Sequence, residues 1–202
     1  MSQAVLLNGI LATDSQMLMN INARDEYIGF GQKLFVSPCK RAALGIVGGE
    51  FNSTELSLVW GFIIPRLAAF YLSYDAANPL EFSEDERGLL SGMSAKGVKV
   101  IRRMFLVTQE HAWLIERDVD EGAVVRSIDP TQYWTEGSEG NFANVFYKAG
   151  FDAPEIIRRI SLLANTCGGE VQALEMSTLD AFPREATQAK PAKKPRAPRG
   201  VK

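Results

Sequence analysis

The chain has 202 residues, 46% of them hydrophobic, and a formal net charge of −2 at neutral pH. This size supports one well-packed domain with a terminal extension and argues against two full domains. The sequence holds two cysteines without Cys-x-x-Cys spacing and one histidine, His111, so it lacks the pattern of a zinc site or a Ser-His-Asp triad. It also shows no secretory signal and no phosphate-binding loop motif. We therefore expect a cytoplasmic protein with no metal and no cofactor.

Residues 2–15 predict an antiparallel hairpin. The alternating apolar stretches AVLL and ILA flank Asn8-Gly9, a strong signal for a two-residue turn. Serine follows the initiator methionine, so removal of Met1 leaves an α-amine and a hydroxyl together on Ser2, at the edge of a sheet. Such a residue combines a nucleophile with its own base.

The next segments are predicted as a loop, two strands and a long helix. Residues 16–31 are mixed and predict loops, whereas KLFVS (33–37) and AALGIVG (42–48) predict strands. From Ser53 the apolar residues recur at spacings of three and four, which predicts a helix over 53–72 with a kink at Pro65. Because Pro65 and Arg66 interrupt its apolar run, we expect a buried helix rather than a membrane span.

The second half of the body returns to strands after a polar insertion at 74–96. Strands are predicted at 102–108, 111–117 and 123–128, helices at 141–150 and 153–166, and a last strand at 170–176. This order predicts an α+β protein in which helices lie outside antiparallel sheets.

The C-terminal segment differs in charge from the body. Residues 184–202 hold seven Lys/Arg and one Glu, which leaves 15 basic and 23 acidic residues, a charge of −8, for the rest. We expect a folded domain over 1–182 and a disordered Lys/Pro-rich tail over 183–202. The tail either only improves solubility or touches nucleic acid or an acidic surface.

These elements resemble the N-terminal-nucleophile hydrolases, in particular the proteasome β-subunits and the HslV-type peptidases. Members begin with Thr, Ser or Cys, run through a hairpin into an xDS or xDG element, and continue to a lysine and to a glycine pair before a helix. The matching stretches here are Ser2, NGILATDS, QKLF, GIVGGEFNSTEL and EGSEGNFA, and ANTCGGEV stands where the family has an SGG element. The resemblance covers residues 2–180 and implies a four-layer αββα sandwich of two antiparallel sheets flanked by helices.

The resemblance implies six site residues, namely Ser2, Asp14, Lys33, Gly48, Gly49 and Ser138. The Ser2 hydroxyl would attack an amide or ester carbonyl while its own amine takes the proton. Lys33, held by Asp14, would keep that amine neutral through its charge. The backbone N–H groups of the glycine pair would receive the oxyanion, and Ser138 would act as a helix cap and a wall of the site rather than in the chemistry.

The chain departs from the family pattern in two places. Its first hairpin is shorter, but with Asn8-Gly9 as the turn Gln3 still faces Asp14 and Ser2 faces Ser15. Ala164 stands where the family has an aspartate, and Cys167 stands where it has a serine. Both changes remove groups that orient the terminal amine.

Three functions follow as alternatives. The first is a peptidase or amidohydrolase that uses Ser2, and the second is a catalytically inactive ring or shell component with the same fold. The third is a nucleic-acid-associated protein that binds through its tail. Because family members assemble into rings, the resemblance implies a homo-oligomer with no membrane contact, and any ATP-driven unfoldase would be a separate chain.

Overall fold

The computed structural model describes residues 2–21, 24–48, 53–73, 80–91, 103–118 and 122–183. Its strands are β1 (Gln3–Leu7), β2 (Ile10–Thr13), β3 (Gln16–Ile21), β4 (Arg24–Phe30), β5 (Leu34–Val36), β6 (Ala42–Val47), β7 (Arg103–Thr108), β8 (Ala112–Asp118), β9 (Gly122–Ile128), β10 (Trp134–Gly137) and β11 (Gln172–Glu175). Its helices are α1 (Ser53–Leu72), α2 (Glu84–Ser91), α3 (Gly140–Lys148), α4 (Ala153–Leu163) and the 3₁₀ turn Met176–Thr178.

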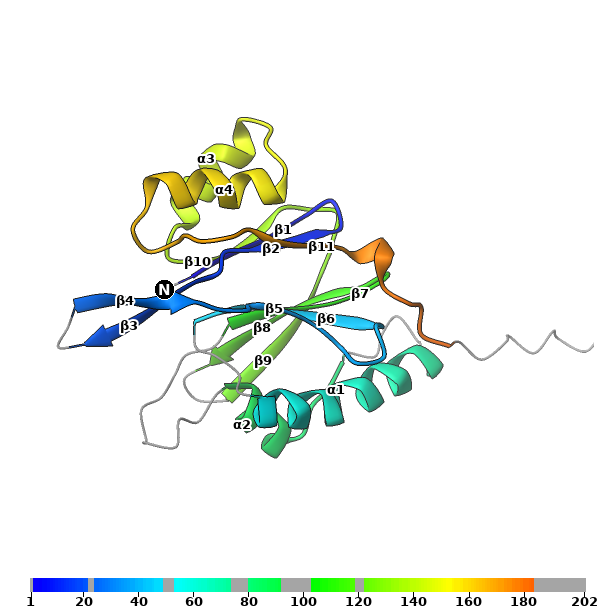
Figure 1. The fold of residues 1–202 in the computed structure, drawn as a ribbon. Coiled ribbons are helices and arrows are strands. Elements are labelled where there is room, and N and C mark those ends of the chain that lie inside the picture. The colour runs from blue at the N-terminus through cyan, green and yellow to red at the C-terminus, as the bar shows by residue number, and fades with distance from the viewer. Residues whose placement is uncertain are drawn as a thin grey trace, which may run out of the picture.

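The described elements stack in four layers, as Figure 1 shows. One antiparallel sheet has the order β10-β1-β2-β11 and the other has the order β5-β6-β7-β8-β9. Helices α3 and α4 cover the outer face of the first sheet, and α1 and α2 cover the outer face of the second (Figure 1). This arrangement confirms the predicted αββα sandwich.

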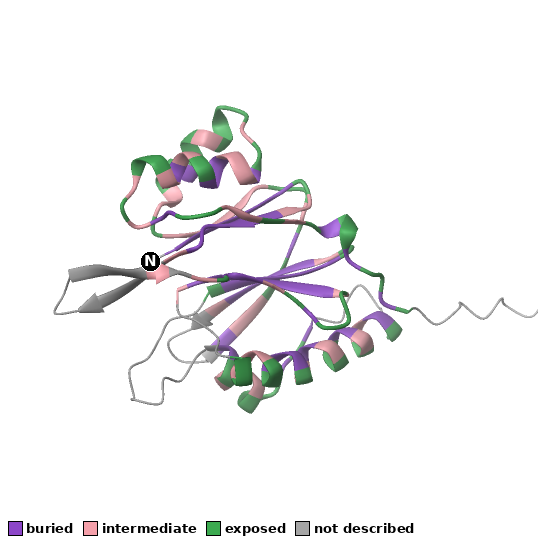
Figure 2. Cartoon of the chain, viewed as in Figure 1, coloured by how far each residue is buried: buried purple, intermediate pink, exposed green. Residues whose placement is uncertain are grey.

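The core fills the three spaces between these layers. The space between the two sheets is packed with side chains such as Leu6, Leu11 and Phe105, none of which is exposed. Separate apolar clusters lie between each sheet and its helices. Buried residues therefore line both faces of the central strands, and exposure is concentrated on the outer sides of the helices (Figure 2).

The first hairpin has the predicted turn and the predicted register. Asn8 and Gly9 have φ values of 51° and 73°, as a two-residue primed turn requires. Ala4 pairs with Thr13, and the same register places Gln3 opposite Asp14. The expectation of a sheet edge was wrong, because β1 lies between β2 and β10 and is paired on both sides.

Several elements differ from those predicted. Residues 16–31, predicted as loops, form the two-stranded sheet β3-β4, which projects beside the start of the chain (Figure 1). Strand β10 was not predicted, and the insertion at 74–96 contains α2 in its described part, 80–91. The proposed tail residues from 184 onward lie outside the described residues.

Helix α1 runs without interruption through Pro65. By length and composition alone it is apolar enough to cross a membrane, and 28% of its most apolar window is buried. In the structure it lies along the outer face of the second sheet, with Trp60, Ile63 and Leu67 buried against that sheet (Figure 1). Its opposite side exposes large apolar residues, including Leu58 and Leu72.

Candidate active site

Asp14 lies at the centre of the candidate site. It directly follows β2, and its side chain is completely buried. Its Oδ1 atom accepts hydrogen bonds from the Gln3 backbone nitrogen at 2.9 Å and from Lys33 Nζ at 3.0 Å. Its Oδ2 atom accepts from the Gly168 backbone nitrogen at 3.3 Å. The Asp14 carboxylate thus joins three segments that are far apart in the sequence, at Gln3, Lys33 and Gly168.

Lys33 provides the buried positive charge. It lies immediately before β5, its side chain is 6% exposed, and Nζ donates to the Gln16 carbonyl as well as to Asp14. The Gln172 side chain accepts from the Lys33 backbone nitrogen at 2.8 Å, which fixes the base of the lysine. A buried pair of this kind needs its extra hydrogen bonds to offset the loss of hydration.

Ser2 is held beside this pair by the backbone. The residue is only 6% exposed in the chain that still carries Met1. Its carbonyl accepts from the Ser138 backbone nitrogen at 3.3 Å, next to Gly137. Gly137 has a φ of +135°, and a Cβ there would lie 2.2 Å from the Ser2 oxygen. Only glycine allows the two segments to approach this closely.

The loop before α3 joins the loop after α4 through side-chain hydroxyls. Glu139, rather than Ser138, is the N-cap residue of α3, so the expected capping role of Ser138 was wrong. Ser138 Oγ instead donates to Thr166 Oγ1 at 3.3 Å, and Thr166 Oγ1 donates to a carboxylate oxygen of Glu139. Sequence reasoning did not find Glu139 or Thr166, because nothing local to either residue signals a contact across 27 positions.

The glycine pair is described only in part. Gly48 directly follows β6 and has a φ of +72°, a conformation that favours glycine. Gly49 lies outside the described residues, and its role in receiving the oxyanion stays a prediction.

Cys167 and Ala164 occupy the two positions at which the chain departs from the resemblance. Burial, and secondarily the negative charge of Asp14, raises the pKa of the Cys167 thiol to about 12. The thiol is therefore protonated at neutral pH and is 1% exposed. Ala164 caps the C-terminal end of α4 and supplies no polar side chain.

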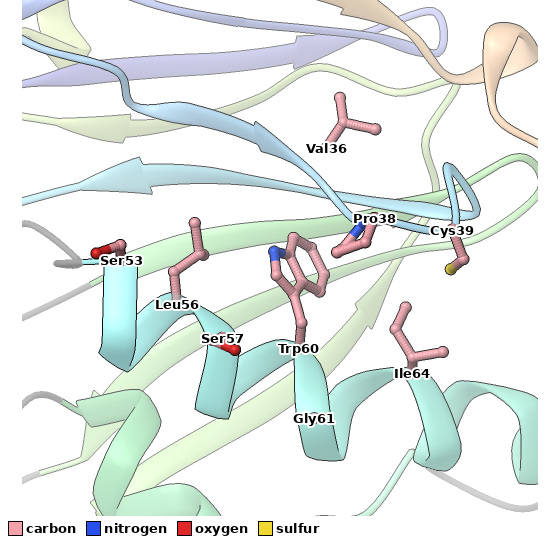
Figure 3. Close-up of a pocket in the computed structure, with 9 residues that line it drawn as sticks. All are labelled: Val36, Pro38, Cys39, Ser53, Leu56, Ser57, Trp60, Gly61 and Ile64. Atoms are coloured by element: carbon pink, nitrogen blue, oxygen red, sulfur yellow. The ribbon is translucent and has the colours of Figure 1, made fainter.

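A separate cavity of about 550 Å³ lies between α1 and the segment that follows β5 (Figure 3). It is lined mainly by apolar side chains from both segments, including Val36, Pro38, Leu56, Trp60 and Ile64, together with Cys39. Its described lining contains none of the six predicted site residues. Among the residues that the structure describes, no cluster of three His, Cys, Asp or Glu side chains forms a metal site.

Comparison with known proteins gives matches in structure only. No protein-family model and no curated protein sequence matches the chain. The eukaryotic HslV of Trypanosoma brucei superposes with a TM-score of 0.51 over 86% of this chain and 97% of its own, at 13% identity. The chain has an HslV-type fold.

Two other structures, both from bacteria, agree with this HslV-type fold. The Anbu Gly-1 mutant from Hyphomicrobium sp. strain MC1 matches with a TM-score of 0.51 at 12% identity, over 89% of this chain and 84% of its own. The Thiobacillus denitrificans protein BPH, in complex with epoxomicin, matches with a TM-score of 0.50 at 11% identity, over 86% of this chain and 97% of its own. Identities this low establish the shared fold, and the chemistry has to be argued from the site.

Proposed function

We propose that this protein is an N-terminal-nucleophile peptidase or amidohydrolase that uses Ser2 after removal of Met1. The observation that carries the proposal is the buried ion pair next to Ser2. Asp14 binds Lys33 Nζ and the backbone nitrogen of Gln3 with the same oxygen atom, Oδ1. That shared contact places a fixed positive charge at the residue that follows the nucleophile. A buried charged pair contributes little net stability, so a functional role explains it better than a structural one.

The reaction needs only groups on this chain and one water molecule. The Ser2 hydroxyl attacks the carbonyl carbon, its proton passes to the Ser2 α-amine, and the carbonyl oxygen becomes an oxyanion. When the intermediate collapses, the C–N bond breaks and the leaving nitrogen takes the proton from the amine. Water then attacks the acyl-serine ester with the amine as base, which releases the carboxylic acid and restores Ser2.

The surrounding groups adjust the charges that appear in this reaction. A terminal amine has a reference pKa of about 7.7–8.0, so roughly a tenth to a sixth of it is neutral and basic at pH 7. The Lys33 cation favours the neutral amine and stabilises the developing negative charge on the serine oxygen. The backbone N–H at Gly48, at the end of β6, would stabilise the oxyanion.

A catalytically inactive ring or shell component is the second candidate. It is favoured by Ala164 and by the buried, protonated Cys167, neither of which offers the terminal amine a charged partner. Retention of Met1 would reject the first candidate at the first step, because a retained methionine blocks the amine. Intact-mass measurement of the purified protein reads this directly.

The proposed activity is tested with short fluorogenic peptides on protein that lacks Met1. Ser2→Ala is expected to lower turnover by about 10³-fold or more, since it removes the nucleophile. Ser57→Ala makes the same chemical change on exposed α1 and is expected to leave turnover unchanged. Equal turnover by Ser2→Ala and the unaltered protein would reject Ser2 as the nucleophile.

We also propose that the protein is a homo-oligomer, consistent with a ring. The exposed apolar side chains of α1, such as Leu58 at 55% and Leu72 at 50%, offer a contact surface. An ATP-driven unfoldase, if one acts here, would be a separate chain. Sedimentation at micromolar concentration is expected to give an assembly, and a monomer would contradict the proposal.

A further inference from the structure

The turn between β10 and α3 is fixed against the start of the chain. Gln3 is fully buried, and its Oε1 atom accepts from the Glu139 backbone nitrogen at 2.9 Å. Its Nε2 atom donates to Thr135 Oγ1 at 2.6 Å. With the contact between the Ser138 nitrogen and the Ser2 carbonyl, residues 138 and 139 are bound to the two residues where the proposed chemistry begins.

The hydroxyls of Ser138, in this turn, and Thr166, in the loop after α4, form a chain of hydrogen bonds that ends at the Glu139 carboxylate. Ser138 Oγ donates to Thr166 Oγ1, and Thr166 Oγ1 donates to Glu139. Because the single Ser138 hydroxyl proton is donated to Thr166, the Ser138 oxygen can still accept a hydrogen bond from another donor through its lone pairs. The Ser138 backbone nitrogen donates to the Ser2 carbonyl at 3.3 Å, so the donor that the proposed function brings to this turn is the Ser2 α-amine.

The Glu139 carboxylate is available for this task. Although Glu139 is the N-cap residue of α3, its side chain makes no capping hydrogen bond. It extends to Thr166 instead, and the positive end of α3 stabilises its negative charge. Asp14, which accepts from the Gln3 backbone nitrogen, is already paired with Lys33.

We propose that Glu139 is a positioning residue for the Ser2 α-amine and acts through Thr166 and Ser138. The resemblance places an aspartate at position 164, at the end of α4, but this chain has Ala164 there. Glu139, at the beginning of α3, supplies a negative charge in its place. This inference rests on the proposed function. In the attack step, the charge stabilises the ammonium group that forms, and the hydroxyl pair orients the amine toward the Ser2 oxygen.

The decisive variant is Glu139→Gln, which keeps an oxygen to accept from Thr166 but removes the charge. We expect kcat to fall about tenfold. We expect the acid limb of the kcat/KM profile to move about half a unit toward lower pH, because the amine loses a nearby negative charge. Glu136→Gln removes a carboxylate from β10 that is bound to Arg103, and it is expected to leave the acid limb in place.

Three further variants separate positioning from folding. Thr166→Ser keeps the hydroxyl and is expected to retain activity, whereas Thr166→Val breaks the connection and is expected to behave like Glu139→Gln. Adding Ala164→Asp to Glu139→Gln is expected to restore most of the lost rate. Thermal unfolding of each variant shows whether a loss of rate merely reflects a loss of fold.

A second measurement does not depend on turnover. The pH dependence of labelling of the Ser2 amine by an amine-reactive reagent, read by mass spectrometry, gives its titration midpoint. A lower midpoint in Glu139→Gln supports the inference, and an unchanged midpoint overturns it. Absence of hydrolysis by the Met1-free protein would instead overturn the proposed function, so the two failures are distinguishable.

Discussion

At the scale of single residues, the ion pair between Lys33 and Asp14 carries a large loss of hydration free energy, because both charges are buried. The Asp14 side chain is fully buried, so its charge depends on a small number of donors. Among the contacts of the Asp14 side chain in the described part of the chain, Lys33 is the only cation. Removing the lysine leaves that carboxylate charged in a medium of low polarity.

Lys33→Met is therefore expected to lower the free energy of unfolding by about 3–5 kcal/mol, the usual cost of breaking a buried pair. The double variant Asp14→Asn/Lys33→Met removes both charges and is expected to lose less than the single variant. Urea denaturation of the two proteins measures the difference. An equal loss in both would show that the charge on Asp14 carries no penalty.

The cysteines give a second prediction at this scale. The raised pKa of Cys167, about 12 against a usual 9.0, means that its reactive thiolate form is scarce at any pH well below 12. Cys39 is exposed. Iodoacetamide is expected to add one label to the native protein at pH 8 and also at pH 9.5. The label should be absent from Cys39→Ser, and a second adduct should appear only after unfolding.

Sequence reasoning reached the residues of the site that sit in short, recognisable patterns. Ser2, Asp14 and Lys33 each lie at a defined place relative to a hairpin or a strand, and the register of the hairpin followed from its turn. Glu139 and Thr166 could not be found in this way, because their contact depends on how two separate loops fold over the sheet.

At the scale of elements, glycine has opposite effects in the first turn and in α1. Gly9 has a φ of +73°, and a Cβ added there would meet open space. Gly61 lies on an exposed part of the helix, where an added Cβ would also meet open space. The surroundings of the added methyl group are therefore matched, and only the backbone conformation differs.

Gly9→Ala is expected to lower the free energy of unfolding by about 1 kcal/mol, because alanine is strained at positive φ. Gly61→Ala is expected to raise it by about 0.5–1 kcal/mol, because alanine is the better helix former. Paired chemical denaturation curves test the two signs. A change of the same sign in both would mean that the turn conformation does not control the first of them.

The predicted elements agree with the structure where the apolar pattern is strong. The period of three to four residues identified α1 from Ser53 onward, and short apolar runs identified β6, β7 and β8. Strands β3 and β4 were missed because they form a separate two-stranded sheet and carry a mixed sequence that has no regular alternation. Strand β10 was missed because TEG at its end has low strand propensity, and its pairing with β1 holds it in place.

At the scale of the whole molecule, charge separates the body from the C-terminal residues. Ending the chain after Pro183 removes seven basic residues and one acidic residue, which changes the net charge from −2 to −8. If the tail binds nucleic acid, the full chain is expected to be retained on immobilised DNA at low salt and released as salt rises.

The truncated protein is expected to pass through the same column at every salt concentration. Hydrolysis of short peptides should be equal in the two proteins, since the described site lies within residues 2–172. Retention that survives truncation would assign the interaction to the body instead.

The contacts of Asp14 also set an order of events during synthesis. Its carboxylate is held by Gly168, the base of Lys33 is held by Gln172, and β11 pairs with β2, so the site is complete only when nearly the whole body has left the ribosome. A chain that is still growing has Ser2 exposed at its beginning but cannot yet close the buried pair around it. The hydrolysis proposed above would therefore begin only after folding ends, so that the nascent chain and its neighbours on the same messenger RNA would be spared.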